Sequence, residues 1–383
     1  MKVLRIFRET LARLLLRGRI LRCWVSRKVK KLETQYVREL VTRSQSPAPT
    51  ESRPKPVSPG TPLKRILFIG QILWEDTQLI PELEKIAAVS VLDLKNVAAS
   101  PTRSRSEAAC QTLERFIGEH QDMRPDIVLF YADSTLLSND AFQLLRGTWA
   151  APIIGMNLDE KIQFLDYGLF SRGADNYERW APRFDFNLSN SLAVCDWYRR
   201  LGLPSHYMPE GTRSQPMPQV DAGGRDFKWN VSFVGSRKPE REAFIENLQA
   251  KGIQVDLFGQ GWSHSQWQDD TREIFTHSRI NLGLGFASPS TKLTTLKGRD
   301  FECPGAGGCY ATTFNWELPL HFDIGREILC YQSLEELVEL ICWHRQRPEL
   351  CRQIGLRAHA RCQRDHTWEK RFRPVFQSLG FAS

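Results

Sequence analysis

The hydrophobic positions of this chain follow three patterns in turn. Over residues 1–44, leucine, phenylalanine and valine recur at helical spacing, and arginine interrupts every apolar run. Residues 45–62 are rich in proline and serine and poor in apolar side chains. From residue 63 onward, short apolar runs alternate with amphipathic stretches. The pattern predicts a basic amphipathic helical extension, a semi-extended linker and a body of alternating strands and helices.

The first part of the body is expected to form one parallel α/β domain over residues 63–220. Near-continuous apolar runs are typical of strands buried on both faces of a parallel sheet, and such runs occupy residues 65–70, 90–94, 126–132 and 152–157. A further strand leads into a helix that begins at about Ser191. A polar, glycine-bearing segment near Met217 to Asp226 then marks the expected domain boundary.

The alternation restarts after this boundary and predicts a second domain over residues 221–365. Its expected strands, with helical stretches among them, lie at residues 229–236, 253–259, 279–285, 307–313 and 327–332. Residues 366–383 are helical, with Trp368 and Phe372 on one side. Open parallel sheets bind ligands beyond the carboxyl ends of their strands, so two Rossmann-like domains predict a cleft between them.

The positive charge is concentrated in the extension. The net charge is +8, yet residues 1–65 hold 17 Lys and Arg against 4 Asp and Glu, which leaves 35 against 40 in the remainder. A basic amphipathic helix is typical of a peripheral anchor on an anionic membrane surface, and the alternative is a helix packed on the body or on a partner. Because the body is mildly acidic, we do not expect it to bind nucleic acid.

The cysteines and histidines favour a cytoplasmic protein without a metal or cofactor. The nine cysteines are odd in number and form no C-x-x-C pair, which suits free thiols in a reducing compartment. The eight histidines are scattered, without H-E-x-x-H. Arginine also breaks the apolar runs of the extension before they reach signal-peptide or transmembrane length.

The turn after the first strand of the second domain combines groups that bind anions. Gly235 and Ser236 end the strand, and Arg237, Lys238 and Arg241 follow as a helix begins. N–H groups at a helix start favour an anion, and flanking cations add charge-assisted hydrogen bonds. We expect a diphosphate here, and the alternative is a solvated basic turn.

A second candidate segment is LKGRDFECPGAGGCYATT. Lys297 and Arg299 precede an expected short helix, Glu302 lies in its first turn, and Gly305 and Gly307 let the backbone pass close to a ligand. A guanidinium binds phosphate in a bidentate way, and a carboxylate accepts both hydroxyls of a ribose. One nucleoside diphosphate could therefore engage both turns.

General-base candidates are expected in loops that follow strands of the first domain. Asp133 follows the apolar run at 126–132, and Asp159 follows the run at 152–157. A carboxylate at either place could deprotonate an acceptor hydroxyl. Each aspartate has an alternative role as the N-cap of the helix after it.

The second domain resembles a known family. The motifs VSFVGSRKPERE, VDLFGQGW, FTHSRINLGL, LKGRDFECPGAGGCYATT, HFDIGREILCY and RDHTWEKR occur in the order found in the spore-maturation (CgeB-like) group of GT-B glycosyltransferases. The resemblance runs from Trp229 to about Arg371, and the first domain is similar only in outline.

The resemblance implies a group 1-like, metal-independent glycosyltransferase, with a nucleotide-sugar donor on the second domain and an acceptor on the first. By position, Arg299 would contact the donor diphosphate and Glu302 the ribose, with Gly305 and Gly307 in the turn beneath them. The last helix of such proteins crosses back onto the first domain. Retaining members often carry E-x7-E, and Thr294 stands where the first acid would be, which leaves the stereochemical outcome open.

We therefore expect a cytoplasmic glycosyltransferase, attached peripherally to the inner face of the membrane, that transfers a sugar to a cell-envelope or lipid-linked acceptor. Three alternatives stay open. The first is a nucleotide-sugar epimerase or hydrolase on the same fold. The second is a non-catalytic, membrane-tethered nucleotide-sugar binding or scaffold protein. The third is a nucleic-acid binder that uses the basic extension.

Overall fold

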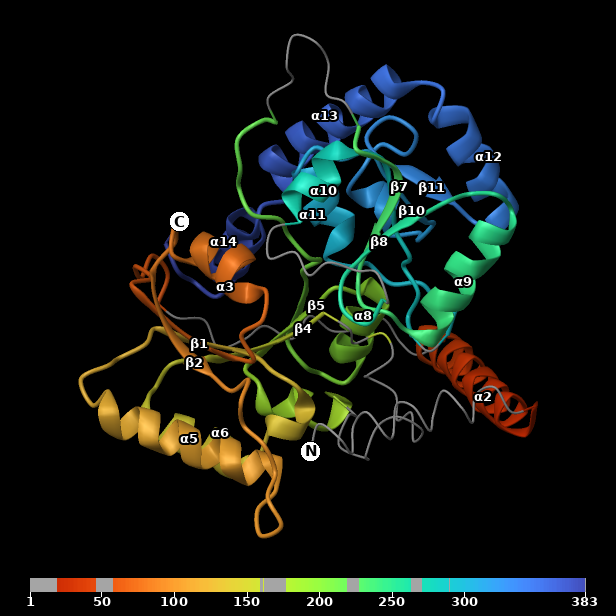
Figure 1. The fold of residues 1–383 in the computed structure, drawn as a ribbon. Helices are drawn as coiled ribbons and strands as arrows, with labels where there is room; N and C mark the ends of the chain where they lie inside the picture. The colour runs from red at the N-terminus through yellow and green to blue at the C-terminus, as the bar shows by residue number, and fades with distance from the viewer. Residues whose placement is uncertain are drawn as a thin grey trace.

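Two α/β domains stand one above the other in the computed structural model (Figure 1). The structure describes residues 19–45, 58–158, 161, 177–218, 227–262, 271–288 and 290–382. Each domain holds one sheet in which all strand pairs are parallel. The predicted class, two Rossmann-like domains facing each other, is confirmed.

The first sheet has six strands in the order β2-β1-β3-β4-β5-β6. Its strands are β1 (Arg65–Gly70), β2 (Ala88–Asp93), β3 (Ile127–Tyr131), β4 (Ile153–Asn157), β5 (Phe186–Ser189) and β6 (Ser205–Tyr207). The helical elements around it are α3 (Glu75–Gln78), α4 (Ile80–Leu83), α5 (Arg105–Glu119), η1 (Ser134–Leu136), α6 (Asn139–Thr148), η2 (Tyr177–Arg179), η3 (Ala181–Arg183) and α8 (Leu192–Arg200).

Alternate residues of β1 enter two separate cores. Leu67 and Ile69 pack with residues of α5, α6 and α8 on one face of the sheet. Ile66 and Phe68 pack on the other face with α4 and with the C-terminal helix α14 (Trp368–Ser378). Both faces are therefore covered, which explains why the strands are apolar along their whole length.

The second sheet has five strands in the order β11-β10-β9-β7-β8. They are β7 (Trp229–Val234), β8 (Asp256–Phe258), β9 (Ser278–Leu282), β10 (Tyr310–Thr313) and β11 (Leu329–Tyr331). The helical elements around this sheet are α9 (Pro239–Ala250), α10 (Arg272–His277), α11 (Arg299–Gly305), η4 (Leu318–Leu320), α12 (Leu334–His344) and α13 (Pro348–Asp365).

Helix α13 was not among the expected elements. Its buried positions are Cys351, Ile354, Gly355, Ala358, His359 and Cys362. Small and polar residues therefore form most of its inner face, and the usual repeat of large apolar side chains is missing.

Two crossing segments join the domains. The first leads out of β6, and the second connects α13 to α14. Thr212 donates its N–H to the carbonyl of His366 (2.9 Å), and Trp368 donates its N–H to the carbonyl of Thr212 (3.0 Å). A side chain on Gly211 would lie 2.9 Å from the backbone nitrogen of Trp368, so glycine permits this close approach. The paired segments hold the two sheets at a defined spacing.

The described part of the extension is one long helix, α2 (Arg19–Ser44), which projects at the lower right of Figure 1. Tyr36 is buried with its ring 5.7 Å from that of Trp197 on α8. Glu33 accepts a hydrogen bond of 2.7 Å from Ser290 of the second domain. The helix thus packs on both domains, and residues 1–18 of the expected extension lie outside the described residues.

Candidate functional site

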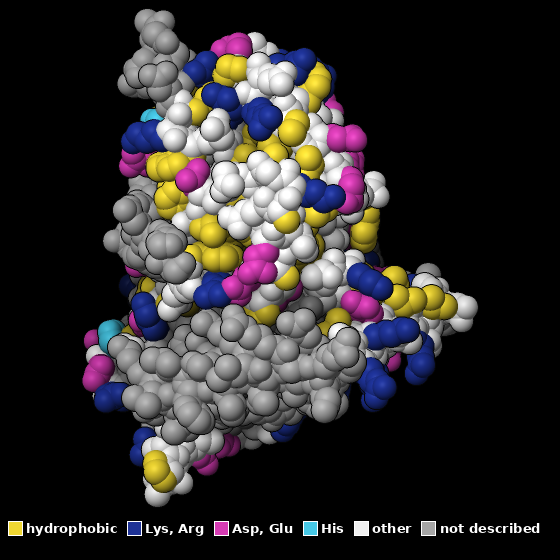
Figure 2. All heavy atoms as spheres, turned by 45° about the vertical axis from the view of Figure 1, so that its right-hand side comes forward, with side chains coloured by type: hydrophobic (Ala, Val, Ile, Leu, Met, Phe, Trp, Pro, Cys, Tyr) yellow, Lys and Arg dark blue, Asp and Glu magenta, His cyan; other side chains and the backbone are white. Residues whose placement is uncertain are grey.

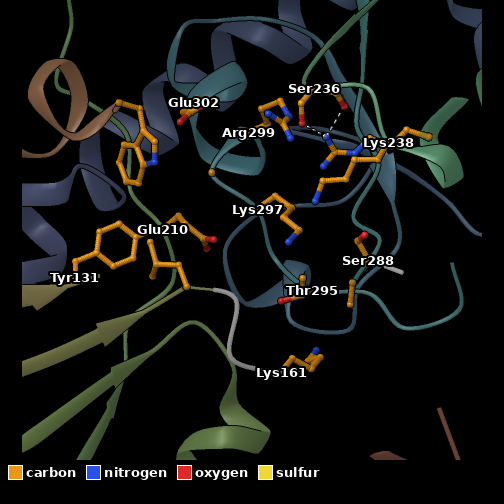
Figure 3. Close-up of a pocket in the computed structure, with 15 residues that line it drawn as sticks. Tyr131, Lys161, Glu210, Ser236, Lys238, Ser288, Thr295, Lys297, Arg299 and Glu302 are labelled. Atoms are coloured by element: carbon orange, nitrogen blue, oxygen red, sulfur yellow. Dashed lines mark hydrogen bonds between the residues drawn. The ribbon is translucent and has the colours of Figure 1, made fainter. Parts of the chain in front are cut away.

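A cavity of about 520 Å³ lies between the domains, where the carboxyl ends of both sheets face each other (Figure 3). Its first-domain wall consists of Trp74, Tyr131, Leu158, Lys161 and Glu210, and its second-domain wall carries Ser236, Lys238, Arg241, Lys297, Arg299 and Glu302. The lining holds five basic side chains and two carboxyl groups. This volume suits a bound small molecule, and the charge favours an anion.

The turn that carries Lys297 and Arg299 is fixed by a buried carboxylate. Asp300, 2% exposed, accepts the N–H of Lys297 at 2.8 Å and the hydroxyl of Thr312 at 3.2 Å. Burial raises the pKa of Asp300, and these hydrogen bonds oppose that rise. Because the backbone of this turn is anchored from inside, its two cations can be presented to the cavity.

Arg299 and Glu302 lie together at the start of α11. Burial raises the pKa of Glu302, and the guanidinium of Arg299 opposes the rise. Arg299 forms no hydrogen bond or salt bridge with any other residue that the structure describes. Its guanidinium is therefore available to an anionic ligand, while Glu302 can accept hydroxyl groups.

The turn between β7 and α9 supplies the other cations of this wall. Arg241, 7% exposed, donates from Nη1 to the carbonyl oxygen of Ser236 at 3.0 Å and to its hydroxyl at 3.3 Å. Its guanidinium also lies over the ring of Phe233, 5.9 Å from the centroid. The residue thus fixes the turn and lines the cavity at once.

Four of the expected donor-binding residues are not in the cavity lining. Arg237 forms an ion pair with Glu242 of its own helix. Gly235 directly follows β7 and lies close to Gly259, whose added side chain would come within 2.7 Å of the carbonyl oxygen of Gly235. Arg237 and Gly235 therefore lie next to the cavity-lining residues Ser236 and Lys238 but do not line the cavity themselves.

Gly305 and Gly307 meet the crossing segment between the domains. A side chain on Gly305 would lie 2.3 Å from the hydroxyl of Thr212, and one on Gly307 would lie 2.5 Å from Pro218. Gly307 also has a φ of 85°, which favours glycine. Their contacts are with protein, and they hold α11 against the first domain.

The base candidate Asp133 does not line the described cavity. Asp133 caps η1 by accepting the N–H of Thr135 at 2.9 Å, and it forms a salt bridge of 3.1 Å with Arg105. This is the capping role that the sequence left open. Asp159 lies outside the described residues.

The first-domain wall contains residues that no motif indicated. Trp74 stacks on Trp368 at 5.7 Å and meets the edge of Tyr131 at 6.1 Å, so an aromatic surface faces the cations. Trp74 follows β1, and Tyr131 ends β3. Only their position in the sequence could have indicated them, because each lies at or just after the carboxyl end of a predicted strand, where ligands bind to parallel sheets.

Lys161 joins the two walls. It is 3% exposed, and its Nζ donates to the carbonyl oxygen of Thr294 at 2.9 Å. Burial lowers its pKa, and the nearby carboxylate of Glu317 opposes that shift. Thr294, where the pattern E-x7-E would place its first acid, thus presents its backbone carbonyl to a lysine of the first domain.

Glu210 is the carboxyl group of the first-domain wall. It is 4% exposed, and its Oε1 accepts a hydrogen bond of 3.0 Å from Asn190. Burial raises the pKa of Glu210 to about 8, although Lys297 lies near enough to lower it. At neutral pH most of the molecules therefore carry a proton on this carboxyl group.

Residues 237–377 match the family described as glycosyl transferase-like. Over this range the second domain is similar to glycosyl transferase-like proteins. The matched range includes the second-domain wall from Lys238 to Glu302, and it ends within α14. The resemblance to glycosyltransferases is thereby confirmed, and the narrower spore-maturation group stays a prediction. The comparison with curated proteins found no match for this chain.

Solved structures place this glycosyltransferase-like domain within a GT-B fold. One is HepE from Anabaena, solved with UDP and glucose. The alignment covers 82% of this chain and 99% of HepE, at 11% identity and a TM-score of 0.57. The alignment with sucrose-phosphate synthase from Thermosynechococcus elongatus covers 82% of this chain and 98% of the synthase, at 13% identity and a TM-score of 0.56. The alignment with TarM covers 72% of this chain and 58% of TarM, at 9% identity and a TM-score of 0.52. At these identities the likeness shows the fold.

Proposed function

We propose that this glycosyltransferase-like chain transfers a sugar from a nucleotide-sugar donor to a hydroxyl group of an acceptor held by the first domain. The observation that carries the proposal is the cationic cavity between the sheets, whose second-domain wall lies within the family match. A sugar nucleotide has a diphosphate at its centre, and this wall concentrates cations around one volume.

The donor is proposed to bind along the second-domain wall. Lys297 and Arg299 engage the diphosphate, with Lys238 beside them, and Glu302 accepts the ribose hydroxyls. HepE, which shares the fold, has been solved with UDP and with UDP-glucose. That precedent supports a nucleoside diphosphate in the corresponding cleft of this chain, and it leaves the base and the sugar to experiment.

Bond cleavage between the sugar and the diphosphate leaves negative charge on the departing oxygens. Cations already held in place stabilise that charge without reorganisation during the reaction. The anchored turn at Asp300 provides such preorganisation for Lys297 and Arg299. Asp159 remains our proposal for the base that takes the acceptor proton, because it follows β4 at the edge of the sheet that borders the cavity.

We further propose a cell-envelope or lipid-linked acceptor at the cytoplasmic face of a membrane. Helix α2 supports this, since Val37 and Val41 are 53% and 49% exposed on an element rich in Lys and Arg. Figure 2 shows apolar and basic side chains intermingled on the projecting helix. Among the helices described, none is apolar over a length that could cross a membrane. Surface binding by charge and apolar contact is the mode proposed.

The test of the donor assignment is calorimetric titration of the full chain. The ligands are UDP, GDP, ADP and dTDP and their conjugates with glucose and N-acetylglucosamine. An Arg299→Ala, Glu302→Ala double variant is expected to lose about 100-fold or more in affinity, since two charge-assisted contacts disappear. Arg237→Ala is the matched control, because this arginine lies in the turn between β7 and α9 but outside the cavity lining, and it pairs with Glu242. Absence of binding to every ligand would overturn the proposal.

The membrane proposal is tested by sedimentation with vesicles of phosphatidylglycerol or phosphatidylcholine. The full chain is expected to bind the anionic vesicles in a salt-sensitive way. A Val37→Asp, Val41→Asp variant should lose much of this binding and stay folded, because both side chains are about half exposed. Equal binding to both vesicle types would contradict the electrostatic part of the proposal.

A further inference from the structure

Glu210 lies in the segment that leaves β6 and crosses to the second domain. Figure 3 shows its carboxyl group directed into the cavity, on the side that faces Lys297. No part of the donor-binding turns described above includes it. A buried carboxyl group at a ligand cavity needs a reason, because burial without full hydrogen bonding is unfavourable.

One oxygen of Glu210 has a protein partner and the other does not. Oε1 accepts from Asn190, which is itself fully buried and also donates to the carbonyl oxygens of Leu158 and Leu296. Oε2 is buried and has no hydrogen-bond partner among the residues described. Asn190 therefore orients the carboxyl group, and Oε2 is left for a group that enters the cavity.

The charges around Glu210 indicate what kind of ligand group could bind to Oε2. Lys297 lies across the cavity, Asp300 opposes ionisation from beneath the same turn, and Arg371 of α14 donates to the backbone carbonyl of Glu210 at 3.3 Å. A carboxyl group that keeps its proton near neutral pH does not repel a diphosphate bound to Lys297. It can also donate through Oε2, and after ionisation it can accept.

A sugar hydroxyl matches this requirement, because it both donates and accepts a hydrogen bond. With the ribose at Glu302 and the diphosphate at Arg299 and Lys297, the remaining part of the donor extends toward the first-domain wall. That part is the sugar. The placement rests on the donor site proposed above.

We propose that Glu210 is a sugar-binding residue, whose Oε2 forms a hydrogen bond with a hydroxyl group of the donor sugar. It therefore recognises the sugar nucleotide and not the free nucleoside diphosphate. The inference deepens the proposed function by assigning sugar recognition to the first domain. It also explains why an otherwise uncompensated carboxyl oxygen is kept at the cavity.

The experiment compares two affinities in each of four full-length proteins: wild type, Glu210→Met, Glu210→Gln and Glu82→Gln. Titration uses the best-bound sugar nucleotide of the panel and its free diphosphate. Glu210→Met, which keeps the length of the side chain and removes its polar atoms, should bind the free diphosphate within about twofold of wild type and the sugar nucleotide about tenfold more weakly. Glu82 is a matched control, since it is 1% exposed in the same domain, pairs with Lys85 and is absent from the cavity lining.

The outcomes separate this inference from the proposed function. If wild type binds no nucleotide of the panel, the proposed function fails and the inference fails with it. If wild type binds but Glu210→Met keeps the same ratio of the two affinities, the inference alone is overturned. Glu210→Gln guards against loss of folding: it keeps a donor and an acceptor at this position, so it should bind the sugar nucleotide more tightly than Glu210→Met does.

Discussion

The two walls of the cavity differ in how the chain builds them. The second-domain wall takes its charged residues from two short stretches, 236–241 and 297–302, each at the start of a helix. The first-domain wall takes isolated residues from the end of β3 and from the segments that follow β1, β4 and β6. A wall built from contiguous stretches can be identified from a sequence motif. A wall assembled from isolated residues becomes visible only when the sheet brings them together.

The largest expected effect concerns Glu210, the buried carboxyl group of the first-domain wall. Its pKa of about 8 in the folded protein exceeds the ordinary value near 4.3. As pH rises above about 4, the unfolded chain releases this proton while the folded protein keeps it, so the stability it contributes at low pH is lost progressively up to pH 8. The charged neighbours of Glu210 are Lys297, Asp300 and Arg371, and all three are unchanged in the Glu210→Gln variant used for comparison.

Urea unfolding at pH 5, 6.5 and 8 measures this effect. From pH 5 to pH 8, wild type should lose on the order of a few kcal/mol relative to Glu210→Gln. Parallel stability curves for the two proteins would show that Glu210 is ionised throughout, contrary to the burial described.

A smaller effect is expected where the second-domain wall rests on the first domain. Gly305→Ala places a methyl group 2.3 Å from the hydroxyl of Thr212, so α11 must move from the crossing segment. We expect a loss of about 1–3 kcal/mol in the free energy of unfolding, with weaker donor binding. Gly147→Ala on α6 is the control, because nothing lies within 4 Å of the added methyl group. Equal stabilities for the two variants would contradict this packing.

The sequence predicted the second-domain wall better than the first-domain wall. β1 has the predicted bounds Arg65–Gly70, since unbroken apolar runs identify strands of a parallel sheet. Lys238, Arg241, Lys297, Arg299 and Glu302 were all assigned from local motifs and all line the cavity. Arg237 satisfied the same motif, yet its side chain turns to Glu242. A motif gives the residue types of a turn, and the side-chain directions depend on neighbours.

The residues that were missed are set by tertiary contacts. Glu210 stands alone in the sequence HYMPEG, and its importance depends on Asn190, which is 20 residues away, and on Lys297 in the other domain. Asp133 followed a strand as a base should, but Arg105 and Thr135 occupy it. Sequence position was insufficient for Glu210 because its partners are distant, and for Asp133 because Arg105, 28 residues away, pairs with it.

A third effect tests the aromatic part of the first-domain wall. Trp74→Ala removes an indole that stacks on Trp368 beside the cavity. We expect the KM for the acceptor to rise about tenfold while donor affinity stays within about twofold, since stacking on a sugar or lipid acceptor would be lost. Trp343→Ala, at an exposed site on α12, provides the control. An equal loss in donor affinity would place the donor against Trp74.

The smallest effect concerns α2 and the loop that carries Ser288 and Thr295 of the cavity lining. Glu33→Ala removes the hydrogen bond from Ser290 at the base of this loop. Donor affinity should fall about twofold to threefold, because one partly buried hydrogen bond is worth about 0.5–1.5 kcal/mol. Glu39→Ala breaks only the pair with Arg43 within α2, and it should leave donor affinity unchanged. Calorimetry on both variants makes the comparison.

The central claim is that one nucleotide-sugar molecule bridges both walls. Hydrogen exchange of the full chain, with and without the sugar nucleotide that binds best, tests it directly. We predict added protection at residues 236–241 and 297–302 and, in the same experiment, at residues 208–212 around Glu210. The free diphosphate should protect the first two segments and leave the third unchanged. Protection that avoids residues 297–302 would contradict the proposed donor site.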